Sequence, residues 1–190
     1  MKLSLPNQLT VARIVFIPVF LLVFYIPLWG VNNYILAAIF FLASVTDWLD
    51  GYLARRWDQQ SAFGAFLDPV ADKLMVATVL VCLVSKYPTF GVTVAAVVIV
   101  GREITVSALR EWMANLGERA KVQVGYPGKI KTSFQMLAIG LMLYEVPLWG
   151  VSALATGKIF LYIAAGLTIW SMLGYLKAAW PSLYESQENQ

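Results

Sequence analysis

The sequence predicts an all-α integral membrane protein, built as a bundle of six transmembrane helices. Of its 190 residues, 59% are hydrophobic and only 13% are charged, which is a far more apolar balance than a soluble domain of this length needs. The apolar residues form continuous runs close to the ~20 residues that a helix requires to cross the hydrocarbon core. These runs also lack the alternation, in segments of about ten residues, that is typical of a membrane β-barrel.

Each predicted span is bounded by residues that interrupt helices. The breaks contain Pro, Gly, Asn or charged residues, as in PLWGVNN and KYPTF. No small-residue cleavage site follows the first basic residues, so we expect a retained first helix and not a removed signal peptide. Residues 1–180 are assigned to a single membrane domain and residues 181–190 to a polar, disordered tail. The predicted spans are 9–29, 33–54, 68–87, 90–113, 130–149 and 157–179.

Basic residues gather in the connections that would lie on one side of the membrane. The N-terminus, the second and fourth connections and the end of the last helix are rich in Lys and Arg, whereas the other three connections hold only Lys86 and Lys158. The positive-inside rule then places both termini in the cytoplasm. We therefore interpret the net charge of +3 as a sign of membrane topology and not of nucleic-acid binding.

Composition also excludes several kinds of chemistry. The sequence contains no histidine and a single cysteine, Cys82. This excludes a Ser-His-Asp triad, a zinc site that uses histidine and a disulfide framework. Any acid–base or metal chemistry must use Asp, Glu, Lys, Arg or Tyr.

Four aspartates form two pairs at the cytoplasmic ends of predicted spans. Asp47 and Asp50 end the second span, and Asp68 and Asp72 begin the third; their spacings of three and four residues put each pair on one helical face. Four unpaired aspartates within a membrane would cost on the order of 10 kcal/mol, and converging carboxylates repel one another. Divalent cations are the expected counter-charge, and carboxylate ligands favour Mg²⁺ or Mn²⁺, which commonly act on phosphates. A lone aspartate would suggest only an interfacial residue, but two matched pairs predict a metal–phosphate site.

The stretch DWLDGYLARRWDQQSAFGAFLDPVAD carries a resemblance to a known family. It fits, without a gap, the pattern D-x2-D-G-x2-A-R-x8-G-x3-D-x3-D of the CDP-alcohol phosphatidyltransferases. Eight fixed positions match by chance on the order of 10⁻¹⁰ times per start position on average residue usage. The likeness extends from about Leu5 to Tyr175. Within it, GREITVSALREWMANLGERAKVQVGYPGKIKTSFQM is similar to the bacterial branch that makes phosphatidylglycerophosphate.

The resemblance implies a six-helix enzyme of anionic phospholipid biosynthesis, usually a homodimer, in the bacterial cytoplasmic (inner) membrane. It would transfer a phosphatidyl group from CDP-diacylglycerol to sn-glycerol 3-phosphate and release CMP, with its active site facing the cytoplasm. Two divalent ions, Mg²⁺ or Mn²⁺, would be bound by Asp47, Asp50, Asp68 and Asp72, with Asp72 also acting as general base. The residues that would contact the CDP part are Thr10, Arg13, Gly51, Arg55 and Ser61.

The acceptor phosphate needs cations that the aspartates cannot provide. Arg102 lies deep in an apolar run, where a charge is costly unless it has a role, and Arg110 lies eight residues further on nearly the same face. Lys129 and Lys131 begin the fifth span. We expect Arg102, Arg110 and one of the lysines to hold the phosphate. The alternatives are a structural pair of Arg102 with Glu103 or a motif aspartate, and positive-inside anchoring for the lysines.

Three other functions remain as alternatives. The first is a member of the same family that uses inositol phosphate, serine or phosphatidylglycerol as acceptor, because the motif recognises only the CDP part of the donor. An intramembrane prenyltransferase would need an acidic pair in the sixth helix, and IFLYIAAGLTIWSMLGYL contains no acid. A cation transporter would place its acids near mid-membrane in discontinuous helices, whereas these acids cluster at one interface.

Overall fold

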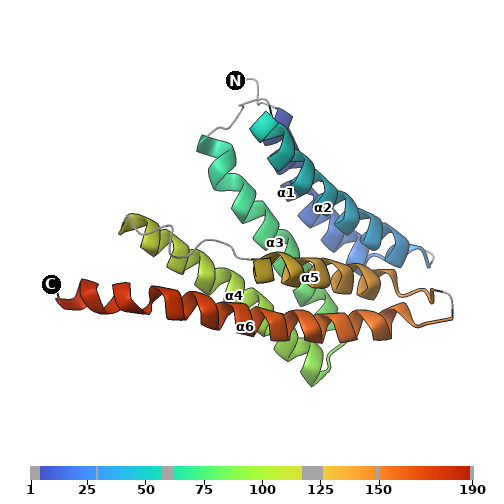
Figure 1. Ribbon diagram of the computed structural model, residues 1–190. Coiled ribbons are helices and arrows are strands. Elements are labelled where there is room, and N and C mark those ends of the chain that lie inside the picture. The colour runs from blue at the N-terminus through green and yellow to red at the C-terminus, as the bar shows by residue number, and fades with distance from the viewer. Residues whose placement is uncertain (1–4, 29, 57–61, 117–125, 149, 189–190) are drawn as a thin grey trace. The chain divides into compact units, whose positions relative to one another are not determined.

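The computed structural model describes residues 5–28, 30–56, 62–116, 126–148 and 150–188 (Figure 1). Within these ranges the chain forms helices and no β-strand beyond one isolated bridge between Leu148 and Val151, which confirms the all-α class. In chain order the helices are α1 (Leu5–Tyr25), α2 (Asn32–Arg56), α3 (Ala62–Lys86), α4 (Phe90–Asn115), α5 (Tyr126–Tyr144) and α6 (Ala153–Glu188).

Each predicted span corresponds to one helix, but several ends differ. α1 and α5 begin earlier than the predicted residues 9 and 130, and each has a proline, Pro6 or Pro127, in its first turn. Proline suits that position because its missing N–H would have no partner there and its φ angle is already helical. The predicted start of α3 at residue 68 was wrong: the helix begins at Ala62 and continues through Pro69. Asp68 and Asp72 therefore lie inside α3 and not in its first turn.

The end of the last helix also differs from the prediction. α6 continues to Glu188, so the expectation of a disordered tail was wrong for residues 181–188. The polar composition of this segment was the reason for predicting disorder. Polar residues such as Glu and Gln are good helix formers, so a helix can extend beyond the hydrocarbon core.

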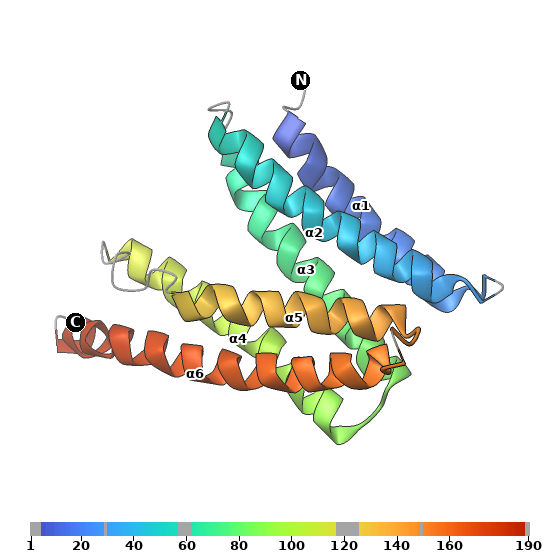
Figure 2. The same cartoon turned by 45° about the vertical axis from the view of Figure 1, so that its right-hand side comes forward.

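The helices divide between two compact units. The first contains residues 1–87 and 139–157, and the second contains residues 88–138 and 158–190. In the first unit, α1 packs along both α2 and α3, as Figure 2 shows. In the second unit, Val106 and Met113 of α4 form a buried cluster with Tyr175 and Ala179 of α6.

Two similar turns occur in the first unit. The sequence PLWGV occurs at 27–31 and again at 147–151, and its glycines, Gly30 and Gly150, have φ angles of 82° and 80°. Glycine adopts this left-handed region without steric cost. The helices that border the turns are joined, because the side chain of Asn33 donates a hydrogen bond of 2.7 Å to the carbonyl oxygen of Tyr144.

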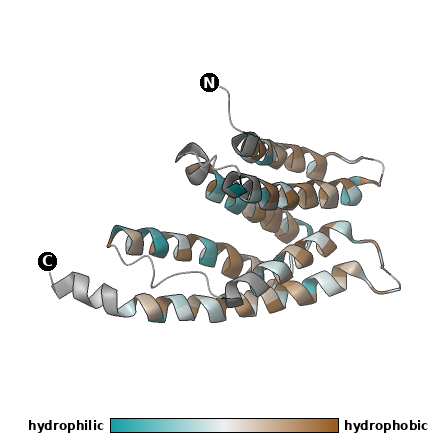
Figure 3. Cartoon of the chain, turned by 45° about the horizontal axis from the view of Figure 1, so that its top comes forward, coloured by the Kyte–Doolittle hydropathy of each residue, from teal (hydrophilic) through white to brown (hydrophobic). Residues whose placement is uncertain are grey.

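Among the described residues, three helical stretches are long and apolar enough to cross a membrane: Gln8–Tyr25, Phe90–Asn115 and Ala153–Trp180. Hydrophobic residues follow most of the helical ribbon in Figure 3. Many large hydrophobic side chains are exposed, including Phe41 at 66%, Phe66 at 69% and Trp170 at 65%. So much exposed apolar surface is rare on a soluble monomer and fits a lipid-facing exterior.

Candidate active site

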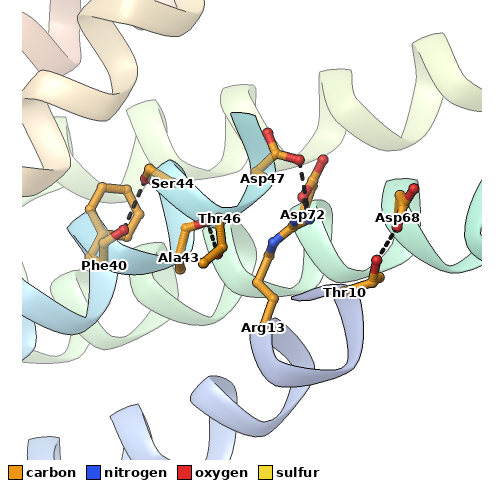
Figure 4. Close-up of polar contacts among 9 residues, drawn as sticks. All are labelled: Thr10, Arg13, Phe40, Ala43, Ser44, Thr46, Asp47, Asp68 and Asp72. Carbon is orange, nitrogen blue, oxygen red and sulfur yellow. Dashed lines mark hydrogen bonds and ion pairs between the residues drawn. The ribbon is translucent and has the colours of Figure 1, made fainter. Parts of the chain in front are cut away.

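The buried polar face of α1 forms the inner side of the candidate site. Thr10 and Arg13 are three residues apart, on one face of a largely apolar helix, and their exposed fractions are 0% and 1%. A buried cation in an apolar helix is costly unless an anion or an acceptor is close. Both side chains are directed at α2 and α3 (Figure 4), the helices that carry the four aspartates.

Arg13 joins one aspartate from each of these helices. Its Nη1 atom lies 3.1 Å from Oδ1 of Asp47 on α2, and the same nitrogen donates a hydrogen bond to Oδ1 of Asp72 on α3. The guanidinium is buried, whereas the side chains of Asp47 and Asp72 are 44% and 40% exposed. The cation therefore supports the two carboxylates from inside the unit and leaves part of each accessible from outside.

Thr10 makes a second contact between α1 and α3. Its hydroxyl donates a hydrogen bond to Oδ1 of Asp68. The spacing of three residues on α1 thus matches the spacing of four on α3, so that Thr10 meets Asp68 and Arg13 meets Asp72. The structure brings five of the predicted residues into one site: Thr10, Arg13, Asp47, Asp68 and Asp72.

The other predicted residues cannot be assigned to the site from the described contacts. Asp50, Gly51 and Arg55 belong to α2, but only their place in the helix is described, and Ser61 lies in the undescribed range 57–61. The pairing of Arg13 with the aspartates was not predicted from the sequence. The available signal was Arg13 itself, a charge within an apolar first helix, which requires an ionic partner.

The potential metal ligands of the site match the preference of a hard divalent cation. Asp47, Asp68 and Asp72 present only carboxylate oxygens, the ligands that Mg²⁺ and Mn²⁺ prefer. Two of these carboxylates already share one cationic partner, Arg13. Positive charge close to them is therefore favourable. Among the described side chains no three potential ligands are close enough together to hold an ion, and Asp50, the fourth predicted ligand, is not among them.

The second unit contains a separate cluster of charges. Oε1 of Glu103 lies 3.0 Å from Nη1 of Arg102 on the same helix and 2.8 Å from Nζ of Lys131 on α5. Both cations are buried, at 8% and 3% exposed. The structural pair between Arg102 and Glu103 that the sequence left as an alternative is therefore present. Arg110 is exposed, and the side chain of Lys129 is outside the described residues.

Known proteins resemble the chain over nearly its whole length. The sequence model for CDP-alcohol phosphatidyltransferases matches residues 3–170. A Haemophilus influenzae protein named CDP-diacylglycerol–glycerol-3-phosphate 3-phosphatidyltransferase is 51% identical over 186 residues, which are 98% of each chain. Proteins of the same name from Escherichia coli K12 and Shigella flexneri serotype 5b are each 48% identical over 180 residues, covering 94% of this chain and 96% of theirs.

Proposed function

The chain belongs to the CDP-alcohol phosphatidyltransferase family, and from that premise we propose that it transfers a phosphatidyl group from CDP-diacylglycerol to sn-glycerol 3-phosphate. The products would be phosphatidylglycerophosphate, a precursor of anionic phospholipids, and CMP. The observation that carries the choice of acceptor is the identity of 51% over 98% of both chains to a relative named for this reaction. Siblings that use another acceptor would share the aspartate motif but not this degree of full-length identity.

The reaction exchanges one phosphorus–oxygen bond for another. A hydroxyl oxygen of the acceptor bonds to the phosphorus that carries diacylglycerol, and the bond from that phosphorus to the oxygen of CMP breaks. CMP leaves with that oxygen and the bonding electrons. The hydroxyl proton must pass to a base, and with no histidine in the sequence a carboxylate is the available group. We assign this role to Asp72, whose side chain is 40% exposed and is oriented by Arg13.

The four aspartates are the proposed ligands of the divalent cation. Asp47, Asp50, Asp68 and Asp72 would hold Mg²⁺ or Mn²⁺, two ions by the family resemblance, and the bound metal would neutralise the diphosphate and the departing CMP. The contacts of α1 support this role. Thr10 and Arg13 contact Asp68, Asp47 and Asp72, so that carboxylates from two helices are oriented at one site. Thr10, Arg13, Gly51, Arg55 and Ser61 remain the proposed contacts to the CDP part.

The membrane setting matches the amphiphilic donor. Three helices qualify as spans by length and composition within the described part of the chain. We propose that α2, α3 and α5 also cross the bilayer, with both termini and the aspartates on the cytoplasmic side. The acyl chains of the donor would then stay in the bilayer while its headgroup reaches the aspartates at the interface. We also propose that the protein lies in the cytoplasmic membrane of a bacterium and that it forms a homodimer.

The acceptor phosphate is assigned to the cations of the second unit. Among the described side chains, Arg102 and Lys131 form a cluster with one carboxylate, so that positive charge is in excess. Glycerol 3-phosphate carries about two negative charges at neutral pH, because the second pKa of a phosphate monoester is about 6. Arg110, which is exposed on α4, and Lys129 are the further candidates.

Acceptor-dependent release of CMP tests the function directly. Purified protein in detergent is given CDP-diacylglycerol with glycerol 3-phosphate, inositol phosphate, serine or phosphatidylglycerol, each with and without Mg²⁺ or Mn²⁺. We expect release with glycerol 3-phosphate alone and only when a divalent cation is present. Release with a different acceptor would change the assigned branch, and no release with any acceptor would refute the enzymatic function.

A further inference from the structure

We propose that Glu103 is a positioning residue of the acceptor site. Its carboxylate holds Arg102 of α4 and Lys131 of α5 side by side, so that the two cations together bind one phosphate group. This inference rests on the proposed function, and it adds a residue that neither the aspartate motif nor the predicted cation set contains.

A single oxygen of Glu103 binds both cations. Oε1 is 3.0 Å from Nη1 of Arg102 and 2.8 Å from Nζ of Lys131. Two cations that share one carboxylate oxygen are necessarily near each other, although they come from different helices. Like charges at this separation repel, so the carboxylate between them is what permits the arrangement.

Among the described side chains, the charges of this cluster do not balance. Two cations face one carboxylate, and both cationic side chains are almost fully buried, at 8% and 3% exposed, while Glu103 is 29% exposed. A simple structural bridge between Arg102 and Glu103 would be neutral and would not need Lys131. An excess positive charge in a membrane helix is unfavourable unless an anion joins it.

One hydrogen-bond donor of the cluster also lacks an acceptor. Nε of Arg102 is buried and has no hydrogen-bond partner among the described residues. A buried donor without an acceptor is destabilising, and most such donors in native proteins are paired. A phosphate has several acceptor oxygens and matches the planar, forked arrangement of guanidinium donors.

Tyr175 lies against the guanidinium of Arg102. Cζ of Arg102 lies 5.4 Å from the centroid of the Tyr175 ring, within the range of a cation–π contact. The ring belongs to the buried cluster of α4 and α6 and is itself 8% exposed. Arg102 is therefore held at Nη1 by a carboxylate and has its Cζ over an aromatic ring. A cation held in this way loses little further conformational entropy when a ligand binds.

The test compares substrate dependence in Glu103→Gln with that of the unchanged enzyme. The substitution keeps the shape of the side chain but removes the charge that holds the two cations together. We expect the KM for glycerol 3-phosphate to rise about ten-fold, as for the loss of one charge-assisted hydrogen bond, with the KM for CDP-diacylglycerol changed less than two-fold. Glu103→Asp, which retains the charge, should give an intermediate value. Glu111→Gln removes an exposed carboxylate from the same helix and should leave both values unchanged.

The outcomes separate this inference from the function on which it rests. If Arg102→Ala raises the KM for glycerol 3-phosphate but Glu103→Gln leaves it unchanged or lowers it, the positioning role is refuted and the acceptor site survives. If Arg102→Ala affects both substrates equally, the acceptor site itself is wrong. A rise in both KM values in Glu103→Gln would show a general structural role and refute the proposal. If Glu103→Gln does not fold, as judged by its thermal unfolding in detergent, Glu103→Asp decides: an unchanged KM refutes the proposal.

Discussion

Nη1 of Arg13 lies 3.1 Å from Oδ1 of Asp47, which joins a fully buried cation on α1 to a half-exposed carboxylate on α2. The same nitrogen donates to Asp72 on α3. Two aspartates from different helices thus share one internal counter-ion. Arg13 offsets the repulsion between the two carboxylates before any metal binds. Its contacts therefore join α1 to α2 and α3 and also reduce the net negative charge of the site.

Replacement of Arg13 should change how strongly metal stabilises the protein. Arg13→Gln leaves Asp47 and Asp72 without their shared cation. We expect the free energy of unfolding of the metal-free protein to fall by about 1–3 kcal/mol, between the values for exposed and buried ion pairs. Added Mn²⁺ should then raise Tm by more in the variant than in the unchanged protein, because it replaces the missing charge. Thermal unfolding in detergent with and without Mn²⁺ measures both effects.

The matched control for this prediction is Arg56→Gln. Arg56 is exposed at the end of α2, where it contacts Tyr52, so its loss should change neither the stability nor the response to Mn²⁺. An Arg13→Gln protein with the same metal-dependent rise in Tm as the unchanged protein would contradict the role of Arg13 as a counter-ion.

The hydroxyl of Thr10 should stabilise the contact between α1 and α3. Thr10→Val keeps the shape of this fully buried side chain but removes its hydrogen bond to Asp68. We expect the free energy of unfolding to fall by about 1–2 kcal/mol. Thr10→Ser retains the hydroxyl and should lose less. Equal stability of the Val and Ser variants in thermal unfolding would mean that the hydrogen bond contributes nothing.

The helices were predictable because their signal is local. A continuous apolar run identifies a span by its length alone, and all six runs correspond to helices. The ends were harder to predict, because a membrane helix does not stop where the hydrocarbon does. α3 begins before Asp68 and passes through Pro69, and α6 continues to Glu188. Hydropathy carries no information on either extension.

The site was predictable in part for the same reason. The spacing of each aspartate pair determines that its members share a helical face, which is a local property. The contacts of Arg13 with Asp47 and Asp72 depend on how three helices pack, and no single stretch of sequence encodes that. Similarly, Glu103 was a visible neighbour of Arg102, but its contact with Lys131 on another helix was not foreseen.

Loss of Arg102 should weaken the binding of the acceptor substrate and leave that of the donor little changed. Arg102→Ala removes a buried guanidinium that we assign to the acceptor phosphate. We expect the KM for glycerol 3-phosphate to rise by a factor of about ten to a hundred, as for a lost hydrogen bond to a charged group, with little change for CDP-diacylglycerol. Initial rates at varied concentrations of each substrate measure this. Arg110→Ala, at an exposed position on the same helix, should have a smaller effect.

Asp72 should be required for turnover but not for binding of the donor. Asp72→Asn keeps the shape of the side chain and an oxygen that can accept from Arg13, but it cannot take a proton from the acceptor hydroxyl. Loss of a general base lowers rates by about 10²–10⁴-fold, so we expect acceptor-dependent CMP release to fall at least a hundred-fold. Calorimetric titration with CDP-diacylglycerol in detergent should still show binding. Robust CMP release by Asp72→Asn would exclude Asp72 as the base, and loss of donor binding together with turnover would assign it to the binding of metal and nucleotide instead.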